Sequence, residues 1–130
     1  MSSFITKLQK RLAQEESGFT LIELLIVLVI IGILLAIAVP SYLGFKDRAS
    51  KSAAQANVRS AIPAVEAYYA DNGTYVGMDS VALASIDAGV QVTVGSSPSA
   101  TSYCVSNTQG GFTYRKVGPS GSIVAGVACT

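Results

Sequence analysis

The hydrophobic positions of the chain first form one long, nearly uninterrupted apolar run. From Phe19 to Val39 the side chains are mostly Leu, Ile, Val and Ala, and Glu23 carries the only charge. As a helix that rises about 1.5 Å per residue, this run is roughly 30 Å long, which matches the hydrocarbon core of a bilayer. The run therefore predicts a helix that lies in lipid or packs against other copies of itself.

After Pro40 the apolar residues recur every three or four positions, which is typical of one buried face of an amphipathic helix. The expected buried stripe comprises Tyr42, Phe45, Ala49, Ala53, Ala56, Val58, Ile62, Val65 and Tyr69. Pro63 lies inside this stripe and is expected to bend the helix, whereas Asp71-Asn72-Gly73 is a stop signal. We therefore expect one continuous helix over residues 19–70, apolar all round in its first half.

The last part of the chain carries turn and strand signals. Asp79 is expected to cap a short helix that ends at Ile86. Alternating and β-branched residues predict four strands, at 90–94, 101–107, 112–117 and 122–128. The long helix is the only apolar surface available to cover such a sheet. The expected fold is thus α+β, with a small antiparallel sheet of four strands on the amphipathic half of the helix.

The composition excludes several functions. The chain has no histidine, a net charge of +1 and two cysteines. It contains no G-x-S-x-G sequence, no phosphate-binding loop and no paired carboxylates, so we expect no enzyme activity, no cofactor and no metal site. Arg115 and Lys116 are the only basic residues beyond the long helix, so direct, specific binding of nucleic acid is not expected.

Residues 1–18 form a separate block with three bases, Lys7, Lys10 and Arg11, followed by two acids. Bases before an apolar run keep the start of the chain in the cytoplasm, while the remainder crosses outward. Three interpretations remain open: a secretory signal cut after Ala38, an uncut membrane anchor, or a leader cut between Gly18 and Phe19.

The sequence GFTLIELLIVLVIIGIL at residues 18–34 resembles the processing signature of type IV prepilins. The same signature is found in the pseudopilins of type II secretion systems. In that family a prepilin peptidase cuts after the glycine and methylates the amino group of the following phenylalanine. The resemblance therefore implies cleavage between Gly18 and Phe19 and N-methylation of Phe19.

Glu23 requires a partner, because a carboxylate in hydrocarbon costs about 2.5–3.5 kcal/mol. The apolar run contains no Lys, Arg or His, so the amino terminus created by cleavage is the only nearby cation. The resemblance implies that Glu23 meets this terminus in a neighbouring subunit and sets the axial register of a filament. The alternative is a carboxylate that reaches water at the membrane surface.

Gly32 and Pro40 are expected helix breaks, since Gly weakens a helix by about 1 kcal/mol and Pro by about 3 kcal/mol relative to Ala. The resemblance implies that the segment between them unwinds in the filament. A simple kink at Pro40 is the alternative.

The chain has two cysteines, Cys104 and Cys129, and both lie in the part expected outside the cytoplasm. An even number of cysteines in that location favours a disulfide bond over two free thiols. Such a bridge stabilises by about 3 kcal/mol in the chain-entropy model. A bridge near the C-terminus is also frequent in pilins.

The resemblance implies a structural subunit of a type IV pilus, supporting adhesion, twitching motility or DNA uptake. Its expected parts are a removed leader (1–18), a transmembrane and filament-core helix (19–40), an amphipathic half-helix (41–70) and a head (71–130). The expected partners are other copies in a helical filament, the prepilin peptidase, and the assembly platform and ATPases of the inner membrane, with the final location an extracellular pilus. The alternatives are a pseudopilin of a type II secretion system and an extracellular binding domain held by a signal or helix anchor.

Overall fold

The computed structural model describes residues 2–16 and 18–130. Met1 and Ser17, both part of the expected leader 1–18, lie outside the described residues. The chain divides into two compact units, Met1–Leu43 and Gly44–Thr130, and one helix runs through the boundary between them.

The first unit contains helix α1 (Ser2–Glu16) and the start of helix α2 (Leu21–Asn72). Helix α2 is the long helix that the sequence predicts, displaced by two residues at each end. Among the described residues, it is the one helix long and apolar enough to cross a membrane. This element confirms the expected apolar helix.

Helix α2 continues through Gly32 and Pro40 without interruption. The hydroxyl of Ser41 donates to the carbonyl oxygen of Ile37 at 3.2 Å, one turn back and directly beside the proline. The flanking Leu, Ile and Ala residues are compatible with a helix, so neither residue ends it in the single chain. Unwinding of this segment in a filament stays a prediction.

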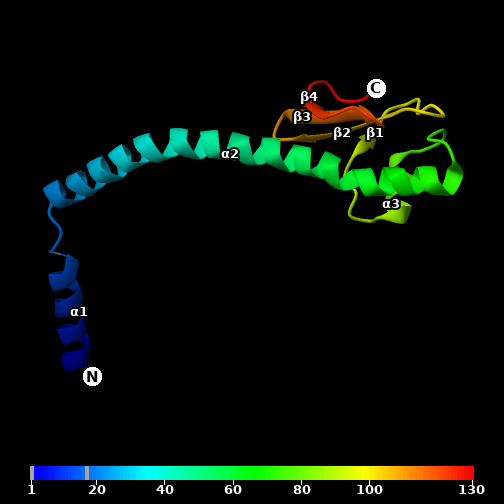
Figure 1. Ribbon diagram of the computed structural model, residues 1–130. Helices are drawn as coiled ribbons and strands as arrows, with labels where there is room; N and C mark the ends of the chain where they lie inside the picture. Colours follow the sequence, from blue (N-terminus) through cyan, green and yellow to red (C-terminus); the bar gives the residue numbers. More distant parts are fainter. Residues whose placement is uncertain (1, 17) are drawn as a thin grey trace. The chain divides into compact units, whose positions relative to one another are not determined.

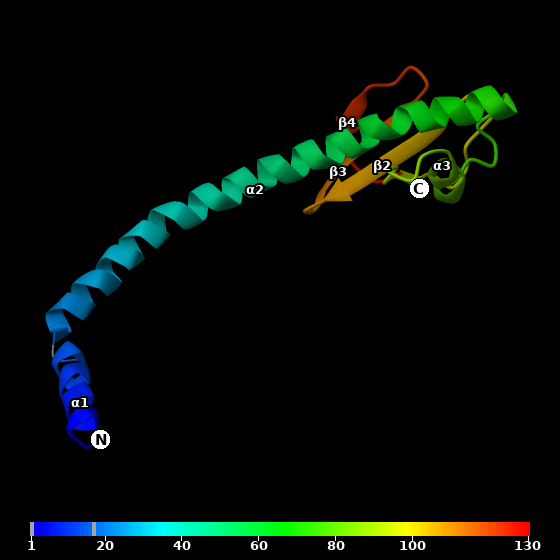
Figure 2. The same cartoon turned by 90° about the horizontal axis from the view of Figure 1, so that it is seen from below.

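The second unit is an antiparallel sheet on the second half of α2 (Figures 1 and 2). The sheet has the order β1-β2-β3-β4 and consists of β1 (Thr93–Val94), β2 (Tyr103–Gln109), β3 (Phe112–Gly118) and β4 (Ile123–Ala125). All neighbouring strands pair antiparallel. The expected α+β class and the four-stranded sheet are confirmed.

Strand β1 is shorter than the expected strand at 90–94. Only Thr93 and Val94 pair with β2. Just before them, the side-chain amide of Asn107 donates to the carbonyl oxygen of Gln91. The chain before Thr93 is therefore attached to β2 by a side chain instead of by backbone pairing, which is why the strand begins late.

Two local signals predicted element ends correctly. The Asp79 carboxylate accepts a hydrogen bond from the backbone N–H of Ala82 at 2.7 Å and caps helix α3 (Ser80–Ile86). Helix α2 ends at Asn72, and Gly73 follows with φ +70° and donates to the carbonyl oxygen of Tyr69 at 2.7 Å. Both signals were readable because a capping residue acts within one turn of itself.

The core of the second unit lies between α2, α3 and the sheet. Its buried hydrophobic residues are Val58, Ala61, Ala64, Val65, Tyr75, Met78, Leu83, Val92, Tyr103 and Val105. The predicted stripe on α2 is correct at Val58 and Val65. It is wrong at Tyr42 and Phe45, which are 65% and 75% exposed, and the other exposed members of the predicted stripe are Ala49, Ala53, Ala56 and Tyr69. The buried residues of α2 begin only at Ala54, so nothing in the described chain covers the earlier part of the stripe.

Candidate functional site

The expected cleavage point lies in a short non-helical stretch. Helix α1 ends at Glu16 and α2 begins at Leu21, and Gly18, Phe19 and Thr20 between them have no helical assignment. All three residues are exposed, and Phe19 is 81% exposed. A protease needs an open, unpaired backbone at the bond it cuts, so this stretch has the required accessibility.

The first turn of α2 is closed by a reciprocal pair of hydrogen bonds between Thr20 and Glu23. The backbone N–H of Thr20 donates to Oε2 of Glu23 at 3.0 Å, and the backbone N–H of Glu23 donates to Oγ1 of Thr20 at 3.3 Å. The carbonyl oxygen of Thr20 accepts the first helical bond, from Leu24 N–H, at 3.2 Å. This arrangement is a capping box with Thr20 as the N-cap.

The capping box gives Glu23 a partner inside its own chain. The sequence analysis expected either a neighbouring amino terminus or surface water as the partner of this carboxylate and missed the backbone donor of Thr20. The missed signal is the spacing Thr20-x-x-Glu23 directly before an apolar run, which is the pattern of a capping box. An acid in the first turn also interacts favourably with the positive end of the helix dipole.

The capping contact uses one carboxylate oxygen of Glu23. Oε2 accepts from Thr20, and in the described residues no hydrogen bond to Oε1 is present. Since the Phe19–Thr20 peptide bond lies after the expected cut, the N–H of Thr20 survives cleavage. Glu23 is therefore able to keep its cap and still offer an oxygen to a second donor.

The apolar half of α2 lacks any covering surface in the described chain. Its large side chains from Leu21 to Val39 are 47–88% exposed. Such a surface is stable only in lipid or against other apolar helices, because apolar area in water costs about 25 cal/mol per Å².

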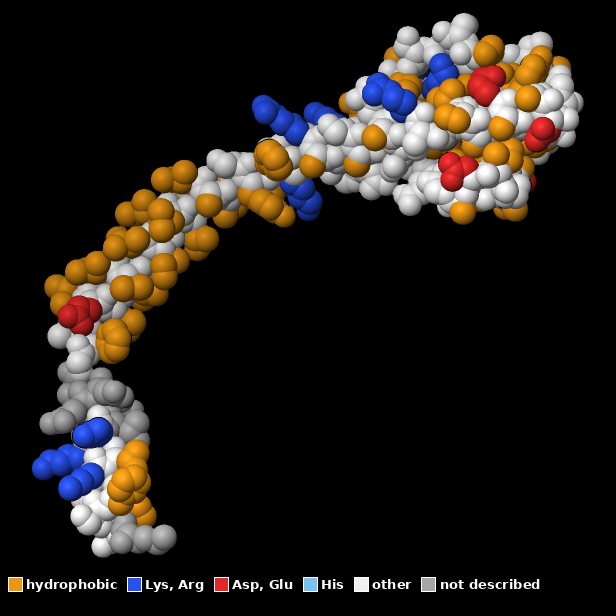
Figure 3. Space-filling model, turned by 60° about the horizontal axis from the view of Figure 1, so that its bottom comes forward, with side chains coloured by type: hydrophobic (Ala, Val, Ile, Leu, Met, Phe, Trp, Pro, Cys, Tyr) orange, Lys and Arg blue, Asp and Glu red, His pale blue; other side chains and the backbone are white. Residues whose placement is uncertain are grey.

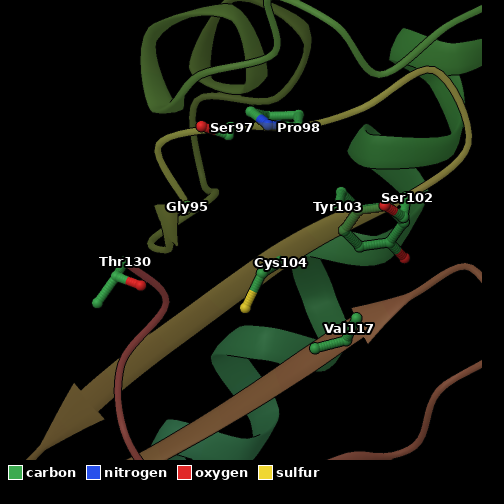
Figure 4. Close-up of a pocket in the computed structure, with 8 residues that line it drawn as sticks. All are labelled: Gly95, Ser97, Pro98, Ser102, Tyr103, Cys104, Val117 and Thr130. Carbon is green, nitrogen blue, oxygen red and sulfur yellow. The ribbon is translucent and has the colours of Figure 1, made fainter.

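In the second unit, the disulfide bond between Cys104 and Cys129 joins β2 to the C-terminal segment, with the two Cα atoms 5.7 Å apart. Figure 4 shows Cys104 between β2 and the segment that ends at Thr130. The backbone N–H of Gly95 donates to the carbonyl oxygen of Cys104 at 2.9 Å. The hollow beside this bridge is lined by Gly95, Ser97, Pro98, Ser102, Tyr103, Cys104, Val117 and Thr130, with no charged side chain.

Two buried core tyrosines, Tyr75 and Tyr103, pack next to each other and next to the partly exposed Tyr69. The ring of Tyr75 lies 4.6 Å from that of Tyr69 and 4.8 Å from that of Tyr103, measured between centroids. The hydroxyl of Tyr75 donates to Glu66 at 3.4 Å, whereas the buried hydroxyl of Tyr103 has no partner among the described residues. Burial, with a smaller contribution from the negative charge of Glu66, raises the pKa of Tyr103 to about 12.

Within the part of the chain that the structure describes, no group of three or more His, Cys, Asp and Glu side chains is placed to hold a metal ion.

Residues 14–39 match the family described as the prokaryotic N-terminal methylation motif. This range contains the non-helical stretch, the capping box and the apolar run. The match rests on the same residues that carry the geometry described above.

Several characterised proteins are similar to longer parts of the chain. The type IV wide pilus major component PilA4 of Thermus thermophilus is 40% identical over 92 residues, which are 68% of this chain and 70% of that protein. The type IV major pilin PilA of Myxococcus xanthus is 43% identical over 58 residues, 45% of this chain and 26% of that protein. The type II secretion system core protein G of Klebsiella pneumoniae is 30% identical over 102 residues, 78% of this chain and 66% of that protein. No solved structure matches the chain significantly.

Proposed function

The chain belongs to the family of type IV pilins and the related pseudopilins, and on that premise we propose that it is a structural subunit of a type IV pilus. The observation that carries the proposal is the 40% identity to a pilus component over 70% of that protein, which extends well beyond the methylation motif. The matched stretch spans only about a quarter of the Myxococcus pilin. Assembly partners and cellular role are therefore part of the proposal.

The proposed processing removes residues 1–18 between Gly18 and Phe19 and methylates the new amino terminus. The exposed, non-helical stretch from Gly18 to Thr20 supports this step, because the peptidase can reach it without unwinding a helix. Gly18 has no Cβ to obstruct the approach of the enzyme.

The apolar part of α2 then serves twice. It is proposed to hold the subunit in the inner membrane and afterwards to pack against the helices of other subunits in the filament core, moved there by the platform and its cytoplasmic ATPases. Full burial of one Leu, Ile or Val side chain contributes about 1.5–3 kcal/mol. Since 47–88% of each large side chain is exposed in the single chain, many such contributions are available to assembly.

Glu23 is proposed to set the register between subunits. Its Oε2 remains on the Thr20 N–H, while Oε1 accepts from the methylated amino terminus of a neighbour. The cost of a carboxylate in hydrocarbon is about 2.5–3.5 kcal/mol. The pairing offsets this cost only where the Glu23 carboxylate and the amino terminus of the neighbouring subunit lie at the same height along the filament axis. The contact thus stabilises one axial offset between adjacent subunits relative to other offsets.

The second unit, residues 44–130, is proposed to form the outer surface of the filament, where adhesion, twitching motility or DNA uptake would require it. A second candidate is a pseudopilin of a type II secretion system. It is favoured by the 30% identity to a secretion-system protein over 78% of this chain. The higher identity to the pilus component and the disulfide-bonded C-terminal segment favour the pilus.

The first experiment is the intact mass and N-terminal sequence of the protein from its native membrane. A chain that starts at N-methylated Phe19 is expected. A start at Val39 would instead identify a secretory signal, and an uncut chain in cells that contain the peptidase would identify a plain anchor. Electron microscopy of the cell surface then separates the two candidates, because long surface filaments that contain the protein are expected of a pilin alone at native expression levels.

A further inference from the structure

Helix α1 has one apolar face and one basic face. Phe4, Ile5 and Leu8 are 72%, 56% and 46% exposed and fall within an arc of about 100° on the helix. Figure 3 shows apolar side chains along one edge of α1 and Lys and Arg side chains along the other edge. In the described residues, nothing covers either face.

The two chemistries meet in one shallow groove. It is lined by Phe4, Leu8, Lys7 and Arg11, two apolar and two cationic side chains from successive turns. Long basic side chains at the edge of an apolar stripe extend their charges toward water while their stems cover apolar surface. A phospholipid has the matching chemistry, since its phosphate is anionic and its acyl chains are apolar.

The connection to α2 favours lipid over another protein. Four residues, 17–20, separate the end of α1 at Glu16 from the start of α2 at Leu21. A fully extended connection of this length spans about 13 Å. Once the apolar part of α2 is in a bilayer, α1 is therefore held at the headgroup layer, where the cytoplasmic leaflet is anionic.

We propose that α1 is an interfacial helix that lies on anionic phospholipid, with Phe4, Ile5 and Leu8 at the acyl-chain boundary and with Lys7 and Arg11, the bases of the groove, at lipid phosphates. The proposal rests on the proposed function only in taking α2 as the membrane helix. Its consequence is positional: an anchored α1 fixes both ends of the stretch from Gly18 to Thr20 and holds the expected cleavage bond at the membrane surface.

The test uses the absence of tryptophan from the chain. In the full-length protein, Phe4→Trp places a fluorophore on the apolar face, and Thr6→Trp is the matched control on the opposite side of the same helix. Each variant is placed in nanodiscs of phosphatidylcholine alone or mixed with phosphatidylglycerol. Tryptophan emission and quenching by aqueous acrylamide are then measured.

We expect a blue shift and severalfold weaker quenching for the Phe4→Trp variant in the anionic nanodiscs, and little change for the Thr6→Trp variant. Adding Lys7→Gln and Arg11→Gln to the first variant is expected to weaken surface partitioning roughly fivefold per base removed. Equal quenching at both positions in anionic nanodiscs would overturn the proposal. So would protection that ignores anionic lipid and rises with the number of chains per disc, because it would indicate pairing of helices. No peptidase is present, so a native chain that proves uncut would refute the pilus function and leave this result standing.

Discussion

The backbone N–H of Cys129 donates a hydrogen bond to the hydroxyl of Ser106 at 3.1 Å, two residues along β2 from the disulfide partner Cys104. Cys104 and Ser106 share one face of the strand, since side chains alternate. Tyr103 and Val105 point the other way, into the core on α2. The C-terminal segment is thus fixed to the outer face of the sheet by one covalent bond and one hydrogen bond.

Replacement of Ser106 by Ala should destabilise the second unit measurably. Ser106 is 1% exposed, and its loss leaves the N–H of Cys129 without its acceptor in a buried site. The expected loss is about 1–3 kcal/mol of the free energy of unfolding, measured by chemical denaturation of the full-length protein in detergent. Ser120→Ala, at an exposed turn position, is the control and should change little. Equal stability of the two variants would show that the hydrogen bond contributes nothing.

Removal of the disulfide should have a larger effect. The bond closes a loop with a sequence separation of 25 residues, and the chain-entropy model gives about 3 kcal/mol for a loop of this size. The double variant Cys104→Ala and Cys129→Ala is therefore expected to unfold at lower denaturant concentration than wild type. Alkylation of the native protein without reductant checks the premise, since modification of either cysteine would contradict the bond.

Sequence reasoning succeeded where a structural signal acts locally. The capping residue Asp79 and the helix stop at Gly73 were correct because their hydrogen bonds lie within one turn. The disulfide partners were evident because only two cysteines exist.

The remaining features depend on distant parts of the chain. Tyr42 and Phe45 continue an apolar periodicity, yet their exposure depends on where the sheet begins to cover α2. The burial of Ser106 depends on the C-terminal segment. The residues around Ser106 in the strand do not predict that this segment covers it. The bond between Thr20 and Glu23 is different, because the local spacing Thr20-x-x-Glu23 before an apolar run is by itself the pattern of a capping box.

Tyr103 should respond to substitution and to pH in a defined direction. Its hydroxyl is buried without a partner in the described residues, so Tyr103→Phe is expected to be neutral or to raise the free energy of unfolding by up to about 1 kcal/mol. Burial raises the pKa of Tyr103 from 10.0 to about 12, so the unfolded state loses this proton first as pH rises. The ionisation of Tyr103 therefore does not change the free energy of unfolding below pH 10. Between pH 10 and pH 12 it lowers the free energy of unfolding of wild type relative to that of the variant.

Denaturation curves of wild type and Tyr103→Phe at several pH values check this prediction. The quantity of interest is their difference, because the other tyrosines titrate in both proteins. A constant difference through pH 12 would mean that the Tyr103 hydroxyl titrates as an exposed phenol does.

Thr20 and Glu23 allow the capping role of the glutamate to be separated from its charge. Glu23→Gln keeps an acceptor for the Thr20 N–H, since glutamine also serves in a capping box, but it removes the negative charge. Thr20→Val keeps the shape of the threonine and the charge of Glu23 but removes the hydroxyl that accepts from the Glu23 N–H. Loss of an N-cap hydroxyl costs about 1 kcal/mol of helix stability, which the long apolar helix can tolerate.

If the charge of Glu23 sets the register between subunits, Glu23→Gln should abolish or sharply reduce filaments, while Thr20→Val assembles nearly as wild type. Both variants should still be cut after Gly18, as intact mass would show, so that a filament defect reports assembly and not processing. Filaments are counted by electron microscopy in cells that express each variant at equal level. Normal filaments from Glu23→Gln together with a defect in Thr20→Val would reverse the assignment. The charge of Glu23 would then be dispensable for assembly and the cap on the first turn of α2 would be required. Glu23→Gln lacks the charge but keeps an acceptor for the Thr20 N–H, whereas Thr20→Val keeps the charge but lacks the hydroxyl that accepts from the Glu23 N–H.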